Sequence, residues 1–288
     1  MIDNHLLVEL IAFAKYTTLA AAAEHIGISQ PAITRGLQKL EAQFGVKLFK
    51  RTPNRITLTK TGEYTVQKAQ QLLAANATFI EDIRNFNHNQ ETITVASIAP
   101  GPLLVLNRTK ISNLSIQKEL IQSNSLAEEL LLEQRYSCVI TNQPIKNYHI
   151  HSSYLGQESL FVKVNAFSNL GSQHSITFKN LSGLSFIVLN EIGAWTNLIH
   201  QEIPDAKFIY QSEKDFIEIR NNSIFPYFVT NLTSINPTWE PELSNDRILI
   251  KISDKSATMN FYANFLTENQ EVLLPLINLW QDEWENFD

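Results

Sequence analysis

The stretch from residue 29 to residue 35 carries side chains that suit hydrogen bonding to the base edges of DNA. Arginine can donate two hydrogen bonds to guanine, and glutamine can pair with adenine in the same way. Arg35 and Gln30 supply these groups, and Pro31 can contact a thymine methyl group. Basic and hydroxyl side chains nearby suit phosphate contacts, which fix position without reading sequence. The candidate DNA contacts are Gln30, Pro31, Thr34 and Arg35 for bases, and Ser29, Thr18, Lys50, Arg51 and Arg55 for phosphates.

The spacing of apolar residues predicts three helices that would position these side chains. The first covers about residues 3–16. Thr18 is suited to cap the second helix, Leu19–Ile26, and Gly27 suits the left-handed position that ends it. A third helix begins after Ser29 and reaches about residue 44. Two short helices joined by a turn of three to four residues that contains glycine are typical of a helix-turn-helix.

A small basic hairpin, or wing, is predicted from residue 46 to residue 58, because a Pro-Asn turn at 53–54 separates two extended runs. Flexible cations at a loop tip suit phosphate contact. Residues 1–60 carry a net charge of +4, whereas residues 91–288 carry one of −9. This asymmetry points to a polyanionic partner at the N-terminal end.

A long helix is expected at residues 61–86, with one row of side chains at alternating steps of four and three residues. That spacing is typical of a coiled-coil seam, in which a polar residue lowers stability but fixes the register of the two helices. We expect this row to pair with a second copy of the chain, and packing on its own domain is the alternative. The row consists of Ala69, Leu73, Asn76, Ile80 and Ile83.

The polar segment 87–91 is expected to act as a hinge, and beyond it the pattern changes to strands that alternate with helices. Such alternation favours βαβ units and mainly parallel sheets. Strands are expected at 92–97, 115–121, 137–141, 160–166, 186–189, 208–211, 225–230, 248–252 and 260–265, and helices at 103–110, 126–134, 195–201, 213–221 and 271–286.

Candidate ligand-binding residues follow the predicted strands, since ligands of open α/β sheets bind beyond the carboxyl ends of the strands. The first strand leads into a helix whose N–H groups and neighbouring hydroxyls could receive a carboxylate or another anion. A plain capping or loop role remains open for each candidate. The candidates are Ser97, Ile98, Ala99, Pro100, Ser123, Asn124, Thr141, Asn142, Asn190, Glu191 and Trp195.

Other protein classes are disfavoured by what the sequence lacks. The single cysteine, Cys138, excludes an internal disulfide framework, and its apolar surroundings favour a buried thiol over a redox sensor. His149 and His151 could share a strand face, but no third ligand is evident, so we predict no metal and no other cofactor.

No signal peptide and no apolar run of the roughly 18–20 residues of a membrane helix is recognised. We therefore expect a cytoplasmic protein without a membrane partner. The sequence has no Gly-rich phosphate loop, no nucleophile elbow and no paired acid and base. We expect a protein that is not an enzyme.

The N-terminal sequence resembles that of LysR-type transcriptional regulators. The motifs that carry this resemblance occur together, in order and with matching spacing. They are Ser-Gln-Pro-Ala at 29–32, Leu-Glu at 40–41, Phe-Gly-Val-Lys-Leu-Phe-Lys-Arg-Thr at 44–52 and Leu-Thr-Lys-Thr-Gly at 58–62. The resemblance is specific over about residues 1–65, and the length of the chain and its order of elements match over the remainder.

The resemblance implies a mainly α-helical winged helix-turn-helix at 1–60, a linker and dimerisation helix at 61–86, a hinge at 87–91 and an α/β effector-binding domain at 92–288. That domain would have two lobes like those of type 2 periplasmic binding proteins. Lobe I would cover about 92–160 and 259–288, and lobe II about 161–258.

The function that the resemblance implies is sequence-specific DNA binding in a transcription regulator whose activity is modulated by a small-molecule effector bound between the lobes. The implied partners are double-stranded DNA, an unidentified effector and further copies of the chain, as a dimer or a tetramer built from dimers. RNA polymerase is a candidate contact.

One alternative remains open. Thr17 and Ala20 stand where the family usually has Gly and Ser or Thr, which removes a hydroxyl that could contact phosphate. A small-molecule sensor with a degenerate DNA-binding head fits the same residues, and loss of salt-dependent DNA binding would favour it.

Overall fold

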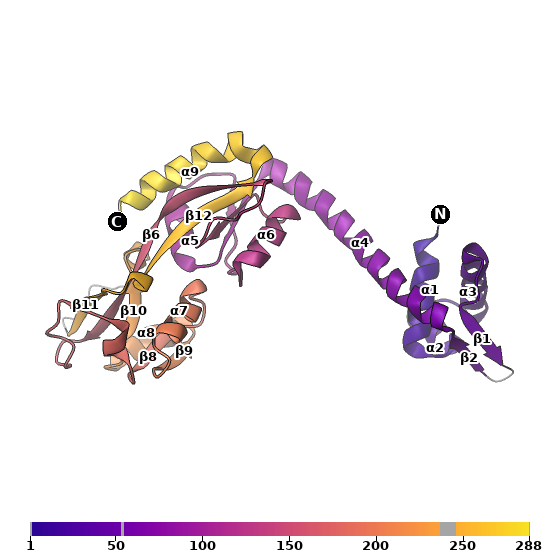
Figure 1. Cartoon of the computed structure of the whole chain (residues 1–288), viewed down its shortest axis with the longest axis horizontal. Helices are drawn as coiled ribbons and strands as arrows, with labels where there is room; N and C mark the ends of the chain where they lie inside the picture. The colour runs from indigo at the N-terminus through magenta and orange to yellow at the C-terminus, as the bar shows by residue number, and fades with distance from the viewer. Residues whose placement is uncertain (1, 53–54, 237–245, 288) are drawn as a thin grey trace. The chain divides into compact units, whose positions relative to one another are not determined.

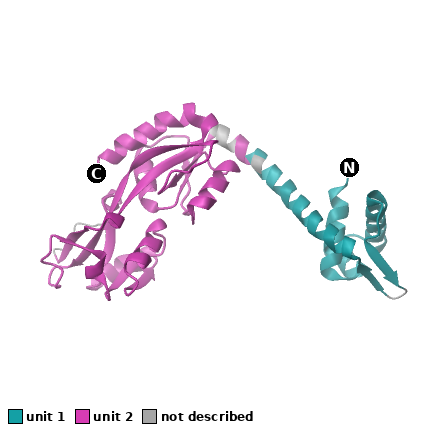
Figure 2. Ribbon diagram, in the orientation of Figure 1, with its two compact units in different colours: residues 1–84 teal, residues 85–288 magenta. Residues whose placement is uncertain are grey.

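The computed structural model describes residues 2–52, 55–236 and 246–287. The chain forms two compact units, residues 1–84 and residues 85–288, which Figure 2 shows in different colours. Each unit has a hydrophobic core of its own. Within the described ranges, no helix combines the length and the apolar character that a membrane span requires.

Unit 1 begins with the three helices that the sequence predicts, α1 (Asn4–Tyr16), α2 (Leu19–Ile26) and α3 (Gln30–Phe44) (Figure 1). Their apolar faces meet in a shared core, in which Leu10 of α1 and Leu37 of α3 are fully buried. The polar face of α3 is thereby turned outward.

The predicted capping residues of these helices are confirmed. The Thr18 hydroxyl accepts a hydrogen bond from the Ala21 N–H at 3.2 Å, and the Ser29 hydroxyl accepts one from the Ala32 N–H at 3.3 Å. Gly27 ends α2 with φ +72°, in the left-handed region that glycine adopts without a steric penalty. These local contacts explain why the chain turns sharply between α2 and α3.

The predicted wing is an antiparallel pair of strands, β1 (Phe49–Thr52) and β2 (Arg55–Leu58). The expected turn at 53–54 lies outside the described residues. Phe49 is buried and contacts the ring of Phe13 edge to face, with 5.4 Å between the ring centroids. The first strand of the wing is therefore anchored on the helical core.

The long helix α4 covers Lys60–Glu91 and crosses the division between the two units. The expectation that it ends near residue 86 is corrected, because the helix continues through the polar segment 87–91 that we assigned to a hinge. Asn, Gln and Glu cost at most about 0.7 kcal/mol each in a helix, and no Gly or Pro interrupts the segment. Polarity alone therefore does not end this helix.

Unit 2 is built on a path of paired strands in the order β4-β3-β5-β12-β6-β10-β8-β9, with β11 paired to β6 and to β7. Pairs among β3, β4 and β5, and the pairs that β8 makes with β9 and β10, are parallel as predicted. Strands β6 and β12 pair antiparallel with their neighbours on this path. The strands are β3 (Ile93–Ser97), β4 (Leu114–Ile116), β5 (Cys138–Thr141), β6 (Ile150–Asn165), β7 (Ser175–Ile176), β8 (Ser185–Leu189), β9 (Lys207–Gln211), β10 (Tyr227–Thr230), β11 (Arg247–Ile252) and β12 (Thr258–Leu266).

Strand β6 belongs to both lobes of unit 2. Its residues 150–159 pair with β12, whereas residues 160–163 pair with β10 and residues 161–165 with β11. Lobe I therefore contains β3, β4, β5, β12 and the first part of β6, and lobe II contains the remainder of β6 with β8, β9, β10 and β11. The sequence predicts only the second part of β6, because residues 150–159 mix polar and small residues without clear alternation.

The helices of unit 2 agree with the predicted ones to within three residues at each end. They are α5 (Pro100–Arg108), α6 (Asn124–Leu132), α7 (Ala194–Glu202), α8 (Glu213–Asn222) and α9 (Gln270–Glu285), with short 3-10 turns at Phe178–Leu181, Thr233–Ile235, Lys255–Ala257 and Thr267–Asn269. The strand expected at 115–121 is shorter than predicted, since β4 ends at Ile116.

Helix α9 packs along β6 and β12, as Figure 1 shows. Trp284 of α9 is fully buried against Gly156 of β6, where an added Cβ would overlap the indole ring. The Trp284 indole N–H also donates to the Gln157 carbonyl at 3.0 Å. The glycine is therefore required by close packing in the hydrophobic core of unit 2.

Candidate nucleic-acid interface and ligand cleft

The side chains predicted to read bases lie on the first half of α3. Gln30, Pro31 and Arg35 are exposed, and Thr34 is half-buried. The Thr34 hydroxyl donates to the Gln30 carbonyl at 2.8 Å, so its proton is used within the helix and its oxygen can act only as an acceptor for DNA. The structure thus presents a polar face that can donate bidentate hydrogen bonds from Arg35.

Gly36 allows α3 to approach α1 closely. A Cβ at this position would overlap the Glu9 carboxylate, which is 4% exposed. Burial raises the pKa of Glu9, while His5, whose Nε2 lies 3.5 Å from Glu9 Oε1, opposes that rise. The glycine inside α3 therefore has a packing reason that spacing within one helix cannot reveal.

Glu41 of α3 fixes the wing. Its Oε1 accepts hydrogen bonds from the N–H groups of Leu48 at 2.8 Å and Phe49 at 3.2 Å. Its Oε2 lies 3.8 Å from an Arg51 guanidinium nitrogen. We did not single out this residue from the sequence, although it is the Glu of the Leu-Glu motif.

The predicted phosphate contacts are exposed around α3 and the wing. Four of the nine predicted DNA contacts line one concave surface of unit 1, of about 770 Å³, between α1, α2 and the wing. These four are Thr18, Gln30, Arg51 and Arg55. The remaining five, Ser29, Pro31, Thr34, Arg35 and Lys50, lie outside that depression. Both groups come from helix N-termini and the wing, the parts of this motif that face a duplex.

The predicted coiled-coil row on α4 is only partly available to a partner. Ala69 is 3% exposed within the core of unit 1, and Leu73 packs against the same core. Their assignment to an intermolecular seam is therefore corrected. Ile80 and Ile83 are 52% and 57% exposed, as a seam requires, and Asn76 is half-buried.

The exposed apolar residues of α4 define a second row that the sequence analysis missed. Leu72, Phe79 and Ile83 are exposed, and with Asn76 they again follow steps of four, three and four. The signal was in the sequence, but only the packing of Ala69 shows which of two overlapping rows faces outward. We call residues 72, 76, 79, 80 and 83 the α4 face.

A cleft of about 980 Å³ lies between the two lobes of unit 2. Its polar character comes partly from an amide pair, in which Asn124 Nδ2 donates to Asn142 Oδ1 at 2.9 Å. No described residue that lines it is Lys or Arg, whereas Glu119, Glu191 and Glu202 contribute carboxylates. The predicted ligand-binding residues that line the cleft are Ile98, Ser123, Asn124, Asn142, Asn190 and Glu191.

The other predicted ligand-binding residues do not line this cleft. The Ser97 hydroxyl accepts from the Ala99 N–H at 3.1 Å, and both residues are fully buried. The Thr141 hydroxyl donates to the Gln143 carbonyl at 2.6 Å. Trp195 is 3% exposed, and Pro100 lines a different cavity with it. The hydroxyls of Ser97 and Thr141 thus form local hydrogen bonds at the ends of their strands.

Gly193 joins the lobes at the edge of the cleft and was not predicted from the sequence. It adopts φ +57°, and a Cβ there would overlap the Ile98 carbonyl. The next residue, Ala194, donates its N–H to that carbonyl at 2.8 Å. The N-terminus of α7 in lobe II is thus hydrogen-bonded to the strand end of lobe I.

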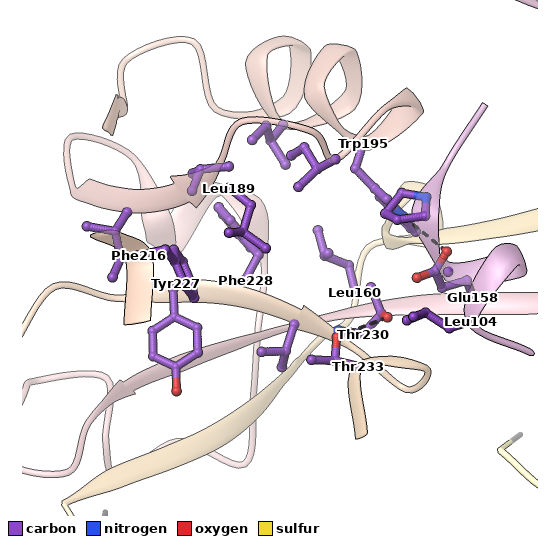
Figure 3. A pocket seen from close by; sticks show the side chains of 17 residues that line it. Leu104, Glu158, Leu160, Leu189, Trp195, Phe216, Tyr227, Phe228, Thr230 and Thr233 are labelled. Carbon is purple, nitrogen blue, oxygen red and sulfur yellow. Dashed lines mark hydrogen bonds between the residues drawn. The ribbon is translucent and has the colours of Figure 1, made fainter. Parts of the chain in front are cut away.

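A second, largely apolar cavity of about 70 Å³ lies beside Trp195. Figure 3 shows Glu158 and Trp195 at one end of it and Phe216 and Tyr227 at the other. The Trp195 indole N–H donates to Glu158 Oε2 at 3.2 Å. Burial raises the pKa of Glu158 to about 7, and the hydrogen bonds from Thr230 and Trp195 oppose that rise.

The sequence contained a signal for Glu158. Strand β6 alternates buried and half-buried residues from this point, so Glu158 occupies the same face as Leu160 and Val162. A carboxyl on the apolar face of a strand is unusual, because burying a charge without a partner is costly.

Cys138 is fully buried in β5, and burial raises the pKa of its thiol to about 12, as a core thiol requires. The His151 ring contacts the Phe265 ring, with 5.1 Å between the centroids and 42° between the planes, and His149 lies in the turn before β6. Among the described residues, no three His, Cys, Asp or Glu side chains are grouped so as to hold a metal ion.

Comparison with known proteins matches the N-terminal part of the chain to a family model. Residues 5–63 match the model described as bacterial regulatory helix-turn-helix protein, lysR family. All nine predicted DNA contacts lie inside this match.

Two curated relatives illustrate the extent of the sequence similarity. The uncharacterized HTH-type transcriptional regulator YbhD of Escherichia coli is 26% identical over 202 residues, which cover 68% of this chain and 63% of that protein. The HTH-type transcriptional regulator PtxR of Pseudomonas aeruginosa is 37% identical over 82 residues, covering 28% of this chain and 26% of that protein. The chain thus matches less than two thirds of the length of either relative.

Solved structures resemble the chain along its whole length. DarR of Vibrio fischeri, solved in complex with DNA, is 17% identical, covers 100% of both chains and has a TM-score of 0.60. A full-length OxyR variant of Pseudomonas aeruginosa is 18% identical, covers 98% of this chain and 99% of its own, and has a TM-score of 0.50. At such low identity, this likeness concerns the fold.

Proposed function

Because residues 5–63 match the model of the lysR family of bacterial regulatory helix-turn-helix proteins, we propose that the chain is a LysR-type, sequence-specific DNA-binding transcription regulator controlled by a small molecule. The observation that carries this proposal is the outward polar face of α3, which is capped by Ser29 and flanked by the basic wing. Such a protein acts by binding rather than by catalysis, at the DNA in the cytoplasm.

In unit 1, α3 contacts the bases and the wing contacts the phosphates. Arg35 and Gln30 read base edges from α3, each good bidentate pair contributing about 1–3 kcal/mol of discrimination. Arg51 and its neighbours on the wing hold phosphates, which positions the helix without specifying sequence. Glu41 supports this arrangement by binding the backbone of the wing.

The α4 face supports pairing of two chains, and Asn76 would fix their register. A dimer presents two copies of α3 to half-sites about one helical turn, or a multiple of it, apart. We further propose that dimers assemble into tetramers and that RNA polymerase is contacted from the DNA-bound form.

The cleft between the lobes is the proposed effector site. Its amides and carboxylates, without a described Lys or Arg, favour a neutral or cationic polar effector over a highly anionic one. An effector changes the assembly only if it binds two arrangements of the protein unequally. The hydrogen bond from the Ala194 N–H to the Ile98 carbonyl joins the two lobes, so a change in their arrangement would affect it.

The test is selection of genomic DNA fragments with the purified chain, followed by affinity measurements over a range of salt concentrations. We expect enrichment of one short site with dyad symmetry. Arg35→Ala should relax its specificity at one base position by about 1–3 kcal/mol, and Arg51→Ala should weaken binding to all sequences and lower the salt slope by about one. Arg135→Ala, which removes an exposed arginine from unit 2, is the matched control and should change neither.

Absence of any enriched site, together with absence of binding at low salt, would contradict the proposal. The chain would then be a small-molecule sensor with a degenerate DNA-binding head, in line with Thr17 and Ala20. Calorimetric titration of candidate metabolites into the chain would remain informative in that case, because the cleft lies wholly in unit 2.

A further inference from the structure

The cavity beside Trp195 is separate from the proposed effector cleft. The two share none of their described lining residues. The cavity lies where the lobes meet, with Gly101 and Leu104 of α5 on one side and Phe228 of β10 on the other. Pro100, Leu104 and Leu189 line both this cavity and an adjacent groove of about 640 Å³, which provides a route of entry.

The walls of the cavity have one chemical feature that stands out from their apolar background. Most of the lining side chains are aliphatic or aromatic. Among the described lining residues, Glu158 carries the only carboxyl, and none is Lys, Arg or His. Glu158 is 2% exposed. Its carboxylate lies against Gly101 of α5, where an added Cβ would overlap the carboxylate oxygens.

An acidic group in such surroundings favours one kind of ligand. An ionised carboxylate without a cation is costly to bury, and a cation that donates a hydrogen bond to it removes that cost. A carboxylic acid would bring a second acidic group to a site without a described cation. A hydrocarbon would leave the oxygens of Glu158 without a new donor.

We propose that this cavity binds a small apolar amine, whose ammonium group donates to the Glu158 carboxylate and whose alkyl part fills the apolar end. The indole N–H of Trp195 already holds one oxygen of that carboxylate at 3.2 Å and so orients it. A bound amine contacts α5 from lobe I and β10 from lobe II, which makes this a second ligand site that spans both lobes. The proposal does not depend on DNA binding.

The test uses isobutylamine and its neutral counterpart isobutanol as probes of the full-length protein. Binding is followed by NMR through the indole N–H resonance of Trp195, which is assigned with Trp195→Phe. The amine stays charged at about pH 6 and about pH 8.5, since primary amines have pKa values of about 10. Because the folded pKa of Glu158 is about 7, we expect the amine to bind roughly tenfold more tightly at the higher pH and isobutanol to show no such change.

Two variants that make the same chemical change separate the site from a general charge effect. Glu158→Gln should abolish the preference for amine over alcohol, whereas Glu218→Gln, at an exposed position on α8, should leave it intact. Equal affinities for the two probes, a preference that survives in Glu158→Gln, or no saturable shift of the Trp195 resonance would each overturn the proposal. The wild-type pH comparison needs no variant, so the proposal stays testable even if Glu158→Gln fails to fold.

Discussion

At the scale of single residues, the most informative backbone position is Thr17. It ends α1 with φ +61° and ψ −11°, and its N–H donates to the Phe13 carbonyl at 2.9 Å. The left-handed region is disfavoured for a β-branched side chain. Thr17, which stands where LysR-type regulators usually have Gly, therefore lowers the free energy of unfolding, besides any effect on DNA binding.

We predict that Thr17→Gly stabilises the protein. Removing the Cβ relieves the left-handed strain, and the gain of about 1–2 kcal/mol is partly offset by the greater freedom of glycine when unfolded, leaving about 1 kcal/mol. Urea unfolding followed by circular dichroism measures the change. Gly27→Ala, which introduces the opposite change at φ +72°, should lower the free energy of unfolding by a similar amount. A loss of stability in Thr17→Gly would contradict this account.

Residue-scale predictions from the sequence succeeded where the cause was local and failed where it was not. The caps at Thr18 and Ser29 need only residues three positions away. Gly36 is explained by Glu9 on another helix, and Gly193 by Ile98 on another lobe. The spacing of residues within one helix or strand cannot predict such contacts with other elements.

At the scale of elements, α4 shows how two overlapping heptad rows are distinguished. Both rows follow the coiled-coil spacing, and both contain Asn76 and Ile83. The core of unit 1 takes up Ala69 and leaves Leu72 and Phe79 exposed at 47% and 64%. The sequence thus predicted the helix, but not which of the two rows is exposed.

We predict that Phe79→Glu and Ile83→Glu each weaken self-association of the chain by about 2 kcal/mol, since a charge would enter a desolvated apolar seam. Sedimentation at a series of concentrations gives the dissociation constant of each variant. Tyr148→Glu, at a position that is 94% exposed in unit 2, makes the same kind of change away from α4 and should have no effect. Unchanged dissociation constants in both α4 variants would exclude this face as the interface.

At the scale of the whole molecule, the order of strands and helices and the split into a helical head and an α/β body were predictable from periodicity. The long strand β6 was not, because its first part mixes polar residues with Gly156 and becomes a strand only by pairing with β12. Ligand-binding candidates in loops after strands, such as Asn142 and Asn190, line the cleft, whereas the hydroxyls of Ser97 and Thr141 are hydrogen-bonded to nearby backbone groups.

Glu158 also affects the stability of the whole molecule. Its pKa is about 7 in the folded protein against an ordinary 4.5, so the folded state binds the proton more tightly than the unfolded state. The contribution of Glu158 to the free energy of unfolding is therefore greatest below pH 4.5. It falls as the pH rises toward 7 and above, by about 3 kcal/mol in total. We predict that Glu158→Gln removes this loss.

Denaturant unfolding at several pH values gives the free energy of unfolding of the wild type and of Glu158→Gln. Relative to the wild type, the variant should become more stable as the pH rises from about 5 to about 8. Glu218→Gln again serves as the control and should follow the wild type. Parallel pH profiles for all three proteins would show that Glu158 is solvated in solution.

The sharing of β6 between two lobes restricts how this protein can change over evolutionary time. Successive strand residues point to opposite faces, so inserting or deleting one residue near Ser159 would turn every later side chain of the strand to the wrong side. One lobe would lose its core while the other kept its own. Substitutions can therefore accumulate along β6, but its length is held constant by both lobes at once, and changes in chain length must be absorbed by the loops.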